Sequence, residues 1–362
     1  GRRPLKAVAR VRIPSGLHPE SFHLRILIPS LTGQLPQVER AATDQLVWVA
    51  RCRDEWLTGK MDLVSSDADE QSRTILTALL GQPILACATI SSGFTAAQVY
   101  RISLAGGHSA VAKVAPWSAE REQVLAGLRI EALVLSTLTA PFLPRLLAAD
   151  DTVGALVIED LGTTGWLPHG TDGQWPIPPQ AAAESIWRTA EAIRTLPIPA
   201  GLPSGHSGLS TVWERVGELD LGPMGIDQTW WQQAAPLLRQ AAAQHELAVS
   251  VLVHGDFKGA NLCLRDGYVV AVDWSGAHHG DPSTDVLEAA IWLRMAGARV
   301  LPPGLEMLPL LSVYGGLLVQ EYLTLHWQAD EQGQRARELK RRTALEALSG
   351  FSELIGVASP SA

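Results

Sequence analysis

Cysteine and lysine are scarce in this sequence of 362 residues. The three cysteines, Cys52, Cys87 and Cys263, lie far apart and form no Cys-x-x-Cys pair. Their spacing argues against a disulfide scaffold and against a structural zinc site, and it favours a reducing compartment. The few lysines stand out against a general preference for arginine, so each is a candidate for a specific role.

Long apolar runs are also missing. No run approaches the roughly 18 to 20 residues that a membrane-spanning helix needs. The basic start, Gly1-Arg2-Arg3-Pro4, is followed by no long apolar stretch, which gives no sign of a secretory signal. A content of 46% hydrophobic and 18% charged residues excludes a disordered chain. We therefore expect a folded, cytoplasmic protein without a membrane partner.

Charge is unevenly distributed along the chain. The whole sequence has 29 basic and 37 acidic residues, and the range 151–330 alone holds 8 basic and 20 acidic ones. This balance argues against nucleic acid as a partner, because phosphate binding needs clustered lysine and arginine. Acidic side chains of this kind favour solubility. The alternative is an acidic cleft that attracts cations.

The length of the chain predicts two or three domains or lobes. Residues 1–65 are expected to form a small β-rich extension of unknown role, with strands at 23–28 and 45–50. A helix with an N-cap near Ser65 and a stop at Gly81 opens the main domain. Within it we expect a β-rich lobe over 66–158 and a helical lobe over 159–362. The expected strands are 99–104, 109–115 and 155–158, and the expected helices are 119–138, 179–195, 208–219, 227–247, 283–298, 306–328 and 331–356.

A hairpin that interrupts the helical lobe carries the most informative residues. Asp266-Gly267 separates two apolar runs, which is a strong hairpin signal. The hairpin would bring Asn261, at the start of one strand, beside Asp273, at the end of the other. Asp256 precedes Asn261 by five residues on the loop that leads in. Three oxygen-bearing side chains are therefore expected to converge at one end of this hairpin.

This set of side chains is what phosphoryl transfer requires. A carboxylate must accept the proton of the acceptor hydroxyl, and an amide oxygen and a carboxylate must hold Mg²⁺ on the nucleotide phosphates. The spacing from Asp256 to Asn261 equals the Asp-to-Asn spacing of the protein-kinase catalytic loop. Phosphoryl transfer is thus the reaction that the spacing favours.

A series of motifs resembles the aminoglycoside phosphotransferase/choline kinase family, the small-molecule branch of the protein-kinase-like fold. It consists of His254-Gly255-Asp256 with Asn261, then Val272-Asp273-Trp274, then Gly280-Asp281-Pro282 and Asp285. The resemblance spans roughly residues 70–355. It implies an α+β, two-lobed fold with a β-rich N-lobe and a mainly helical C-lobe. The His-Arg-Asp, Asp-Phe-Gly and Ala-Pro-Glu motifs of eukaryotic protein kinases are missing.

The resemblance implies roles for the residues of the loop and hairpin. Asp256 would be the catalytic base, or would orient the acceptor hydroxyl, and Asn261 and Asp273 would bind Mg²⁺. Lys258 would contact the transferred phosphate, as the lysine at that place does in protein-serine kinases. The alternative for Lys258 is a solvated surface lysine.

Three further residues would support the loop structurally: His254, Asp281 and Asp285. The resemblance implies that the two carboxylates brace the loop by hydrogen bonds and that His254 lies behind it. Asp281 has an alternative role in the N-cap region of the helix that begins near Ser283.

The resemblance also implies a nucleotide site in the upstream lobe. Lys113 would pair with the phosphates and with a glutamate of the next helix, for which Glu131 is the first choice and Glu122 the second. A reduced glycine turn, made of Ser92, Gly93, Phe94 and Thr95, would cover the phosphates. The connector residues Glu159, Asp160 and Leu161 would meet the adenine. ATP is the implied donor, with GTP as the alternative.

The sequence is rich in tryptophan, with 12 residues. Tryptophans in helices are more often core residues than ligand contacts. Trp166, Trp175, Trp230 and Trp231 lie where this family builds its acceptor pocket, and an aromatic wall there would suit a quaternary ammonium group or a planar or apolar substrate.

The sequence therefore predicts an enzyme, a small-molecule kinase that uses ATP and Mg²⁺ to phosphorylate a hydroxyl. The acceptor would be aminoglycoside-, macrolide-, choline- or sugar-like. Two alternatives remain open: a nucleotide-binding pseudokinase that acts as a scaffold through its N-terminal extension, and a protein-directed kinase. No feature of the sequence indicates an oligomeric state.

Overall fold

The structure is a computed structural model. It describes residues 65–90, 96–168, 175–205, 209–245, 250–265, 268–325 and 331–360. All of these fall in one unit of the chain, Leu63–Ala362. The strands expected at 23–28 and 45–50, the turn Ser92–Thr95 and the hairpin turn Asp266-Gly267 lie outside the described residues.

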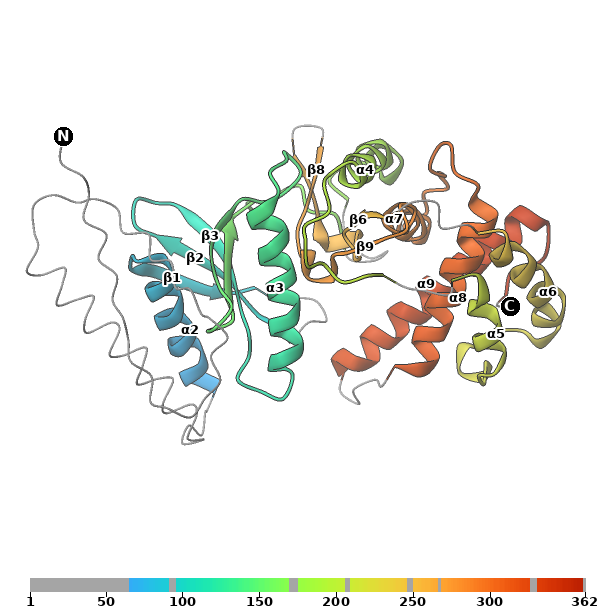
Figure 1. Ribbon diagram of the computed structural model, residues 1–362, viewed down its shortest axis with the longest axis horizontal. Coiled ribbons are helices and arrows are strands. Elements are labelled where there is room, and N and C mark those ends of the chain that lie inside the picture. Colours follow the sequence, from blue (N-terminus) through green and yellow to red (C-terminus); the bar gives the residue numbers. More distant parts are fainter. Residues whose placement is uncertain are drawn as a thin grey trace, which may run out of the picture. The chain divides into compact units, whose positions relative to one another are not determined.

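Five strands form an antiparallel sheet in the β-rich lobe (Figure 1). Their spatial order is β1-β2-β3-β5-β4. The strands are β1 (Ile84–Thr89), β2 (Gln98–Leu104), β3 (Ser109–Val114), β4 (Leu146–Asp150) and β5 (Ala155–Glu159). β4 was not expected from the sequence, because its Leu-Leu-Ala-Ala-Asp stretch lacks the β-branched and aromatic residues that favour strands.

The two faces of this sheet are covered by different helices. On β5, Ala155 and Val157 share a core with α2 (Ser65–Leu80), whereas Leu156 and Ile158 share a core with α3 (Arg121–Thr137). Successive side chains of a strand point to opposite faces, so both faces of β5 are buried. Lys113 of β3 lies directly opposite Leu156 in the ladder, which places it on the α3 face.

Six helices build most of the second lobe, and their bounds lie close to those expected. They are α4 (Pro179–Arg194), α5 (Val212–Gly217), α6 (Gln228–Ala243), α7 (Thr284–Met295), α8 (Met307–Thr324) and α9 (Glu331–Ile355). α8 packs between α6 and α9, and Trp213 of α5 closes the core there with its indole N–H donating to Ser312 of α8. Within the described part of the chain, no helix has the length and apolar character needed to cross a membrane.

Two short strand pairs interrupt the helices and frame the predicted catalytic loop. β6 (Val251–Val253) pairs with β9 (His278–Gly280), and β7 (Leu262–Arg265) pairs with β8 (Tyr268–Ala271). The chain between β6 and β7 is the segment 254–261. Because β6 is fixed at one end and β7 at the other, this segment is a short loop with both ends held.

Candidate active site

The hairpin brings Asn261 and Asp273 to one end, as the Asp-Gly turn predicts. Leu262 pairs with Ala271 at that end of the ladder, and the Val272 N–H donates to the Asn261 carbonyl at 2.9 Å. Asn261 therefore begins one strand at the point where Asp273 follows the other. The side-chain amide of Asn261 donates to the Asp256 carbonyl at 3.0 Å and to Asp256 Oδ2 at 2.6 Å.

Glycine is required at the start of this loop. Gly255 has a φ of +82°, and a Cβ there would lie 2.2 Å from the carbonyl oxygen of Gly276. A real Cβ cannot approach a backbone oxygen so closely, and L-residues rarely adopt this φ. Gly255 thus lets the loop before Asp256 lie against the chain that follows Asp273.

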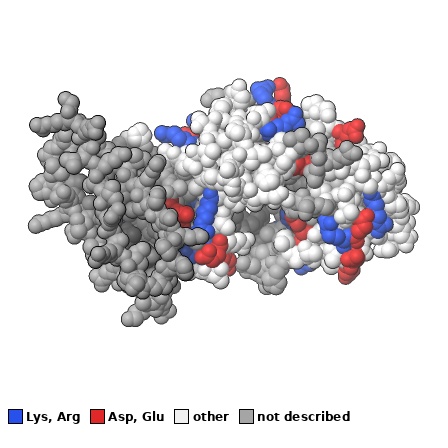
Figure 2. All heavy atoms as spheres, in the orientation of Figure 1, with Lys and Arg blue, Asp and Glu red and all other residues white. Residues whose placement is uncertain are grey.

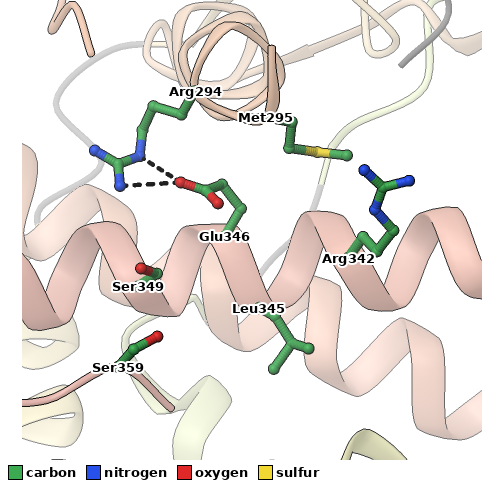
Figure 3. Close-up of a pocket in the computed structure, with 7 residues that line it drawn as sticks. All are labelled: Arg294, Met295, Arg342, Leu345, Glu346, Ser349 and Ser359. Carbon is green, nitrogen blue, oxygen red and sulfur yellow. Dashed lines mark hydrogen bonds and ion pairs between the residues drawn. The ribbon is translucent and has the colours of Figure 1, made fainter. Parts of the chain in front are cut away.

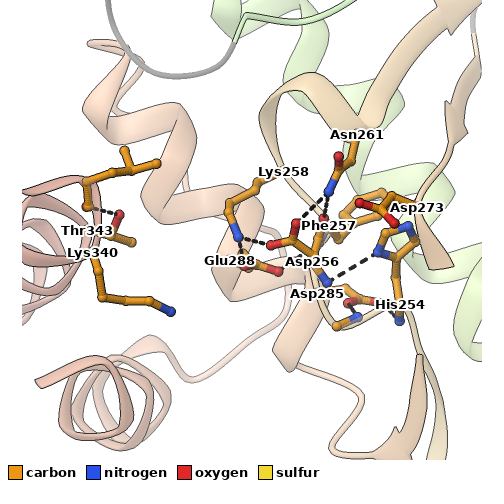
Figure 4. Close-up of polar contacts among 12 residues, drawn as sticks. His254, Asp256, Phe257, Lys258, Asn261, Asp273, Asp285, Glu288, Lys340 and Thr343 are labelled. Atoms are coloured by element: carbon orange, nitrogen blue, oxygen red, sulfur yellow. Dashed lines mark hydrogen bonds and ion pairs between the residues drawn. The ribbon is translucent and has the colours of Figure 1, made fainter. Parts of the chain in front are cut away.

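Asp256 is held by a donor on each carboxylate oxygen (Figure 4). Asn261 donates to Oδ2, and the Lys258 ammonium donates to Oδ1. Burial would raise the pKa of Asp256, but the charge and hydrogen bond of Lys258 outweigh burial and lower it. Asp256 is therefore ionised near neutral pH and can accept a hydrogen bond from a hydroxyl.

Lys258 is bound between two carboxylates. Besides Asp256, its Nζ contacts Glu288 Oε1 of α7 at 2.5 Å. Burial alone would lower the pKa of Lys258, but Glu288 and Asp256 together raise it. The structure therefore places Lys258 in the site as a permanently charged group, not on the surface as a solvated lysine.

Lys113 links the two lobes. Its Nζ lies 2.7 Å from Glu131 Oε2 and 2.8 Å from Asp273 Oδ1. Glu131 belongs to the buried stripe of α3 that also contains Leu128 and Leu135, whereas Glu122, the second choice, is exposed. Burial would lower the pKa of Lys113, but the two carboxylates raise it, so the ammonium stays charged.

Asp273 has a strained backbone. Among the described residues it is the one non-glycine residue with positive φ, at 64°. Such a conformation costs on the order of 1–3 kcal/mol and persists only where the surroundings impose it. Here Lys113 and the Ser275 hydroxyl, at 3.0 Å, both donate to Asp273 Oδ1. The charge of Lys113 also outweighs burial and lowers the pKa of Asp273.

The donor set at the hairpin end fits Mg²⁺. Among the described residues, Oδ1 of Asn261 and Oδ2 of Asp273 have no hydrogen-bond partner, so one amide and one carboxylate oxygen are available. In the same part of the chain, no group of three or more His, Cys, Asp or Glu side chains could hold a metal ion by itself. Mg²⁺ is commonly held by one or two carboxylates with phosphate and water oxygens.

Two of the three predicted supporting residues contact the loop. Asp285 of α7 accepts the N–H groups of His254 at 2.8 Å and Gly255 at 3.0 Å. His254 is fully buried, its Nε2 bonds to the Val272 carbonyl at 3.0 Å, and its Nδ1 accepts the Asp256 N–H at 3.2 Å. Burial lowers the pKa of His254, which keeps the imidazole neutral.

Asp281 lies outside the loop contacts. Its carboxylate accepts the N–H and hydroxyl of Ser283 just before α7, and its Oδ2 lies 2.6 Å from His245 Nε2. The structure therefore brings Asp281 to the start of α7, which is the alternative role that the sequence gave. Of the other two predicted supporting residues, Asp285 bonds to the loop from α7, and His254 is the first residue of the loop itself.

Replacing Asp285 by asparagine is expected to change how stability depends on pH. Burial raises the pKa of Asp285 to about 6, from 3.8. The folded protein then binds this proton more tightly than the unfolded chain. The contribution of Asp285 to the free energy of unfolding is therefore complete below pH 4 and is lost as the pH rises to 6. The free energy of unfolding of the wild type minus that of Asp285→Asn should fall by about 3 kcal/mol over this range.

Urea unfolding of both proteins at several pH values measures this difference. His254 and the other groups titrate in both proteins, so the subtraction removes most of their contribution. A difference that stays constant between pH 4 and 6 would show that Asp285 has an ordinary pKa in the folded state.

The connector between the lobes leaves backbone groups available. Arg101 Nε pairs with Asp160 Oδ2 at 2.9 Å, and the Arg145 N–H donates to Glu159 Oε1 at 2.9 Å, so both acidic side chains are engaged by protein. Among the described residues, neither the Asp160 carbonyl nor the Leu161 N–H has a hydrogen-bond partner. The two groups belong to one trans peptide and point in opposite directions, so only one of them can face a given planar base.

The structure separates the four tryptophans proposed for the acceptor pocket. Trp230 is 3% exposed in the core of the helical lobe, with its indole N–H on Ser352 at 3.0 Å, so it has no face to offer an acceptor. Trp231 packs on Trp213 of the same core, with ring centroids 5.8 Å apart. The prediction of one aromatic wall is thereby corrected for Trp230, because the apolar stripe of α6 faces α8 and α9.

The other two tryptophans belong to different surroundings. Trp166 donates to the Gly162 carbonyl at 2.9 Å and packs beside Leu161 of the connector. Trp175 stacks on Trp292 of α7 with ring centroids 4.6 Å apart. Both are partly buried, so each retains some exposed surface.

A pocket between α7 and α9 lies apart from these residues (Figure 3). It is lined by Arg294, Met295, Arg342, Leu345, Glu346, Ser349 and Ser359. Its volume of about 250 Å³ is below the ~300–1,000 Å³ of ligand pockets. Arg294 is already paired with Glu346 and Glu353, so its charge is compensated, and none of the predicted site residues lines this pocket.

Charges on the surface are mixed. On the face shown in Figure 2, Lys and Arg side chains of the described residues lie next to Asp and Glu rather than in a patch of their own. Ion pairs such as Arg188–Glu184 and Lys340–Glu321 are of this kind. Such neighbouring opposite charges are typical of an ordinary solvated surface.

Sequence reasoning missed two residues that contact the site. Ser275 bonds to Asp273, and Glu288 bonds to Lys258. A signal for Glu288 existed, because it lies one helical turn after Asp285 on the same predicted helix.

Comparison with known proteins identifies the relatives of this chain. The sequence profile of the phosphotransferase enzyme family matches residues 86–309, more than half of the chain. This match confirms the family resemblance drawn from the loop and hairpin motifs. No curated protein matches the chain.

One solved structure shows the same fold, and a second is similar to this chain. The crystal structure of a macrolide 2'-phosphotransferase from Brachybacterium faecium is 17% identical, with a TM-score of 0.50 over 78% of this chain and 98% of that chain. A spectinomycin phosphotransferase in complex with ADP and spectinomycin is 14% identical, with a TM-score of 0.49 over 77% of this chain and 97% of that chain. The expected two-lobed kinase-like fold is confirmed.

Proposed function

The chain belongs to the phosphotransferase enzyme family, and from this premise we propose that it is a small-molecule kinase that transfers the γ-phosphate of ATP to a hydroxyl group. We propose further that the reaction depends on Mg²⁺ and takes place in the cytoplasm. Residues 66–158 would form the nucleotide-binding lobe and residues 159–362 the lobe that carries the catalytic loop.

The observation that carries this proposal is the convergence of three elements at the hairpin. Asp256 and Asn261 come from the loop, Asp273 from the hairpin end, and Lys113 from the sheet of the other lobe. Lys113 contacts both Glu131 and Asp273, so it ties the nucleotide lobe to the hairpin. A scaffold protein would have no need to hold this cluster of charged side chains together.

Asp256 would orient the acceptor hydroxyl by accepting its hydrogen bond. In-line transfer forms a bond from that hydroxyl oxygen to the γ-phosphorus and breaks the bond to the bridging oxygen of ADP, while the hydroxyl proton leaves toward Asp256. The charge of Lys258, beside Asp256, would stabilise the phosphoryl group in transit. Holding both reactants in line supplies much of the rate enhancement.

Asn261 and Asp273 would hold the Mg²⁺, which supplies neutralisation of phosphate charge when it is bound. Lys113 would bind the non-transferred phosphates, and the connector residues Glu159, Asp160 and Leu161 would meet the base. The turn Ser92–Thr95 would cover the phosphates. ATP is the proposed donor because the family resemblance implies it, and GTP is the alternative.

The proposal is tested by ADP release from Mg-ATP across a panel of hydroxyl acceptors. The panel holds aminoglycosides, macrolides, choline, ethanolamine, homoserine, methylthioribose and simple sugars, with Asp256→Asn as the inactive control. A signal that vanishes in the variant would support the enzyme and name its acceptor class. Mg²⁺-dependent nucleotide binding without turnover on any acceptor would instead favour the pseudokinase, and labelled proteins in a lysate would favour the protein-directed kinase.

A further inference from the structure

Glu288 of α7 uses both carboxylate oxygens on the catalytic loop. Oε2 accepts the Phe257 N–H at 2.7 Å, and Oε1 lies 2.5 Å from Lys258 Nζ. Glu288 is buried, with 6% of its surface exposed. It therefore binds the two residues that directly follow Asp256, from a helix thirty residues further along the chain.

Lys258 has one buried and one exposed partner. The Glu288 side chain is 8% exposed, whereas the Asp256 side chain is 42% exposed. Opposite charges attract more strongly where water is excluded. Glu288 is therefore the firmer anchor of the Lys258 ammonium, and Asp256 remains open to an incoming hydroxyl.

We propose that Glu288 is a positioning residue that fixes the Lys258 ammonium beside Asp256, so that its charge faces the phosphoryl group in transit. This inference rests on the proposed function, because the transfer gives Lys258 its role. Without Glu288, Lys258 would keep only its exposed partner and would adopt other rotamers. Its charge would then be displaced from the reacting atoms in part of the molecules.

The substitution Glu288→Gln separates this role from a structural one. Glutamine has the same shape and keeps an oxygen that can accept the Phe257 N–H, but it lacks the charge that holds Lys258. The pair Lys340–Glu321, at 2.6 Å between α9 and α8, offers a matched control. Glu321→Gln makes the same chemical change in an ion pair that contacts neither Asp256 nor Lys258.

The first readout is steady-state kinetics with an acceptor from the panel. Glu288→Gln should lower kcat about tenfold and leave the KM for ATP within about twofold, because Lys258 acts on the transition state and not on ATP binding. Glu321→Gln should keep the wild-type kcat. In a protein that already carries Lys258→Ala, adding Glu288→Gln should lower kcat little further, because the two residues act as one unit.

The second readout does not need turnover. Acetic anhydride labels free amines, and peptide mass spectrometry reports each of the few lysines separately. Glu288→Gln should raise the labelling rate of Lys258 at least about fivefold, because loss of the anion lowers the ammonium pKa. Labelling of Lys113 and Lys340 should stay as in the wild type.

The outcomes distinguish the two proposals. A wild-type protein without turnover on any acceptor contradicts the proposed function. A wild-type enzyme whose Glu288→Gln variant keeps the wild-type kcat overturns the role of Glu288. If Glu288→Gln leaves the labelling rate of Lys258 unchanged, the proposed role of Glu288 is overturned, whether or not the wild type shows turnover. If Glu288→Gln lowers kcat by the same factor in the wild type and in Lys258→Ala, Glu288 only braces the loop.

Discussion

Replacing Asp256 by asparagine is expected to lower kcat by about a thousandfold or more, with nucleotide affinity nearly unchanged. Asparagine has no negative charge to accept the proton of the acceptor hydroxyl or to orient its oxygen toward phosphorus. Lys113 and Asp273 are the groups proposed to bind the nucleotide. Neither forms an ion pair with Asp256, because Lys113 pairs with Asp273 and with Glu131. The loss should therefore fall on the chemical step.

The loop should keep its shape in this variant. Lys258 retains its ion pair with Glu288, and Asp285 still accepts two backbone N–H groups of the loop. Asp220→Asn makes the same substitution in an exposed turn, where Asp220 accepts the Gly222 N–H, and should keep full activity. Single-turnover kinetics and calorimetric titration with a nucleotide would measure the two effects separately.

Full activity in Asp256→Asn would remove Asp256 from the reaction. Loss of nucleotide binding together with activity would instead point to a loop that collapses when its charge is removed. Thermal unfolding of the variant separates these cases, because a collapsed loop lowers the melting temperature and a lost catalytic group does not.

Much of this site could be predicted because its geometry is local. The Asp-Gly turn sets the register that places Asn261 beside Asp273, since a hairpin pairs residues at equal distance from its turn. The family resemblance, not a local pattern, implied that Lys113 pairs with a glutamate of the next helix. Glu131 shares its stripe with Leu128 and Leu135, which distinguishes it from Glu122.

The residues that sequence reasoning missed or misplaced depend on tertiary packing. Glu288 reaches Lys258 only because α7 packs against the loop, and periodicity does not reveal which turn of a helix faces which loop. Trp230 was assigned to a pocket from its place along the chain, although its burial depends on the packing of α6 against α8 and α9. β9, a His-His-Gly stretch, becomes a strand only because β6 lies beside it.

Replacing Asp273 by asparagine is expected to lower kcat/KM by about a thousandfold and to abolish the effect of Mg²⁺ on nucleotide affinity. In the wild type, Asp273 Oδ1 is engaged by Lys113 and Ser275, and Oδ2 is open. Asparagine can still accept these hydrogen bonds through its single oxygen. It then offers the cation an N–H₂ group, which cannot be a ligand, in place of a carboxylate oxygen.

The same substitution should leave the fold nearly intact, and this makes it informative. Asparagine tolerates the left-handed backbone that Asp273 adopts at φ 64°, and Lys113 keeps Glu131 as its counter-ion. Asp150→Asn is the matched control, because Asp150 accepts the N–H groups of Thr152 and Val153 in a turn of the other lobe. That variant should keep both its activity and its response to Mg²⁺.

Titration of a nucleotide with and without Mg²⁺ measures the effect directly. The wild type should bind the nucleotide more tightly when Mg²⁺ is present, and Asp273→Asn should bind it equally well in both conditions. An Asp273→Asn protein that still responds to Mg²⁺ would show that the cation is held elsewhere, and Asn261 would then lose its proposed role as well, because the two residues supply the open oxygens of a single site.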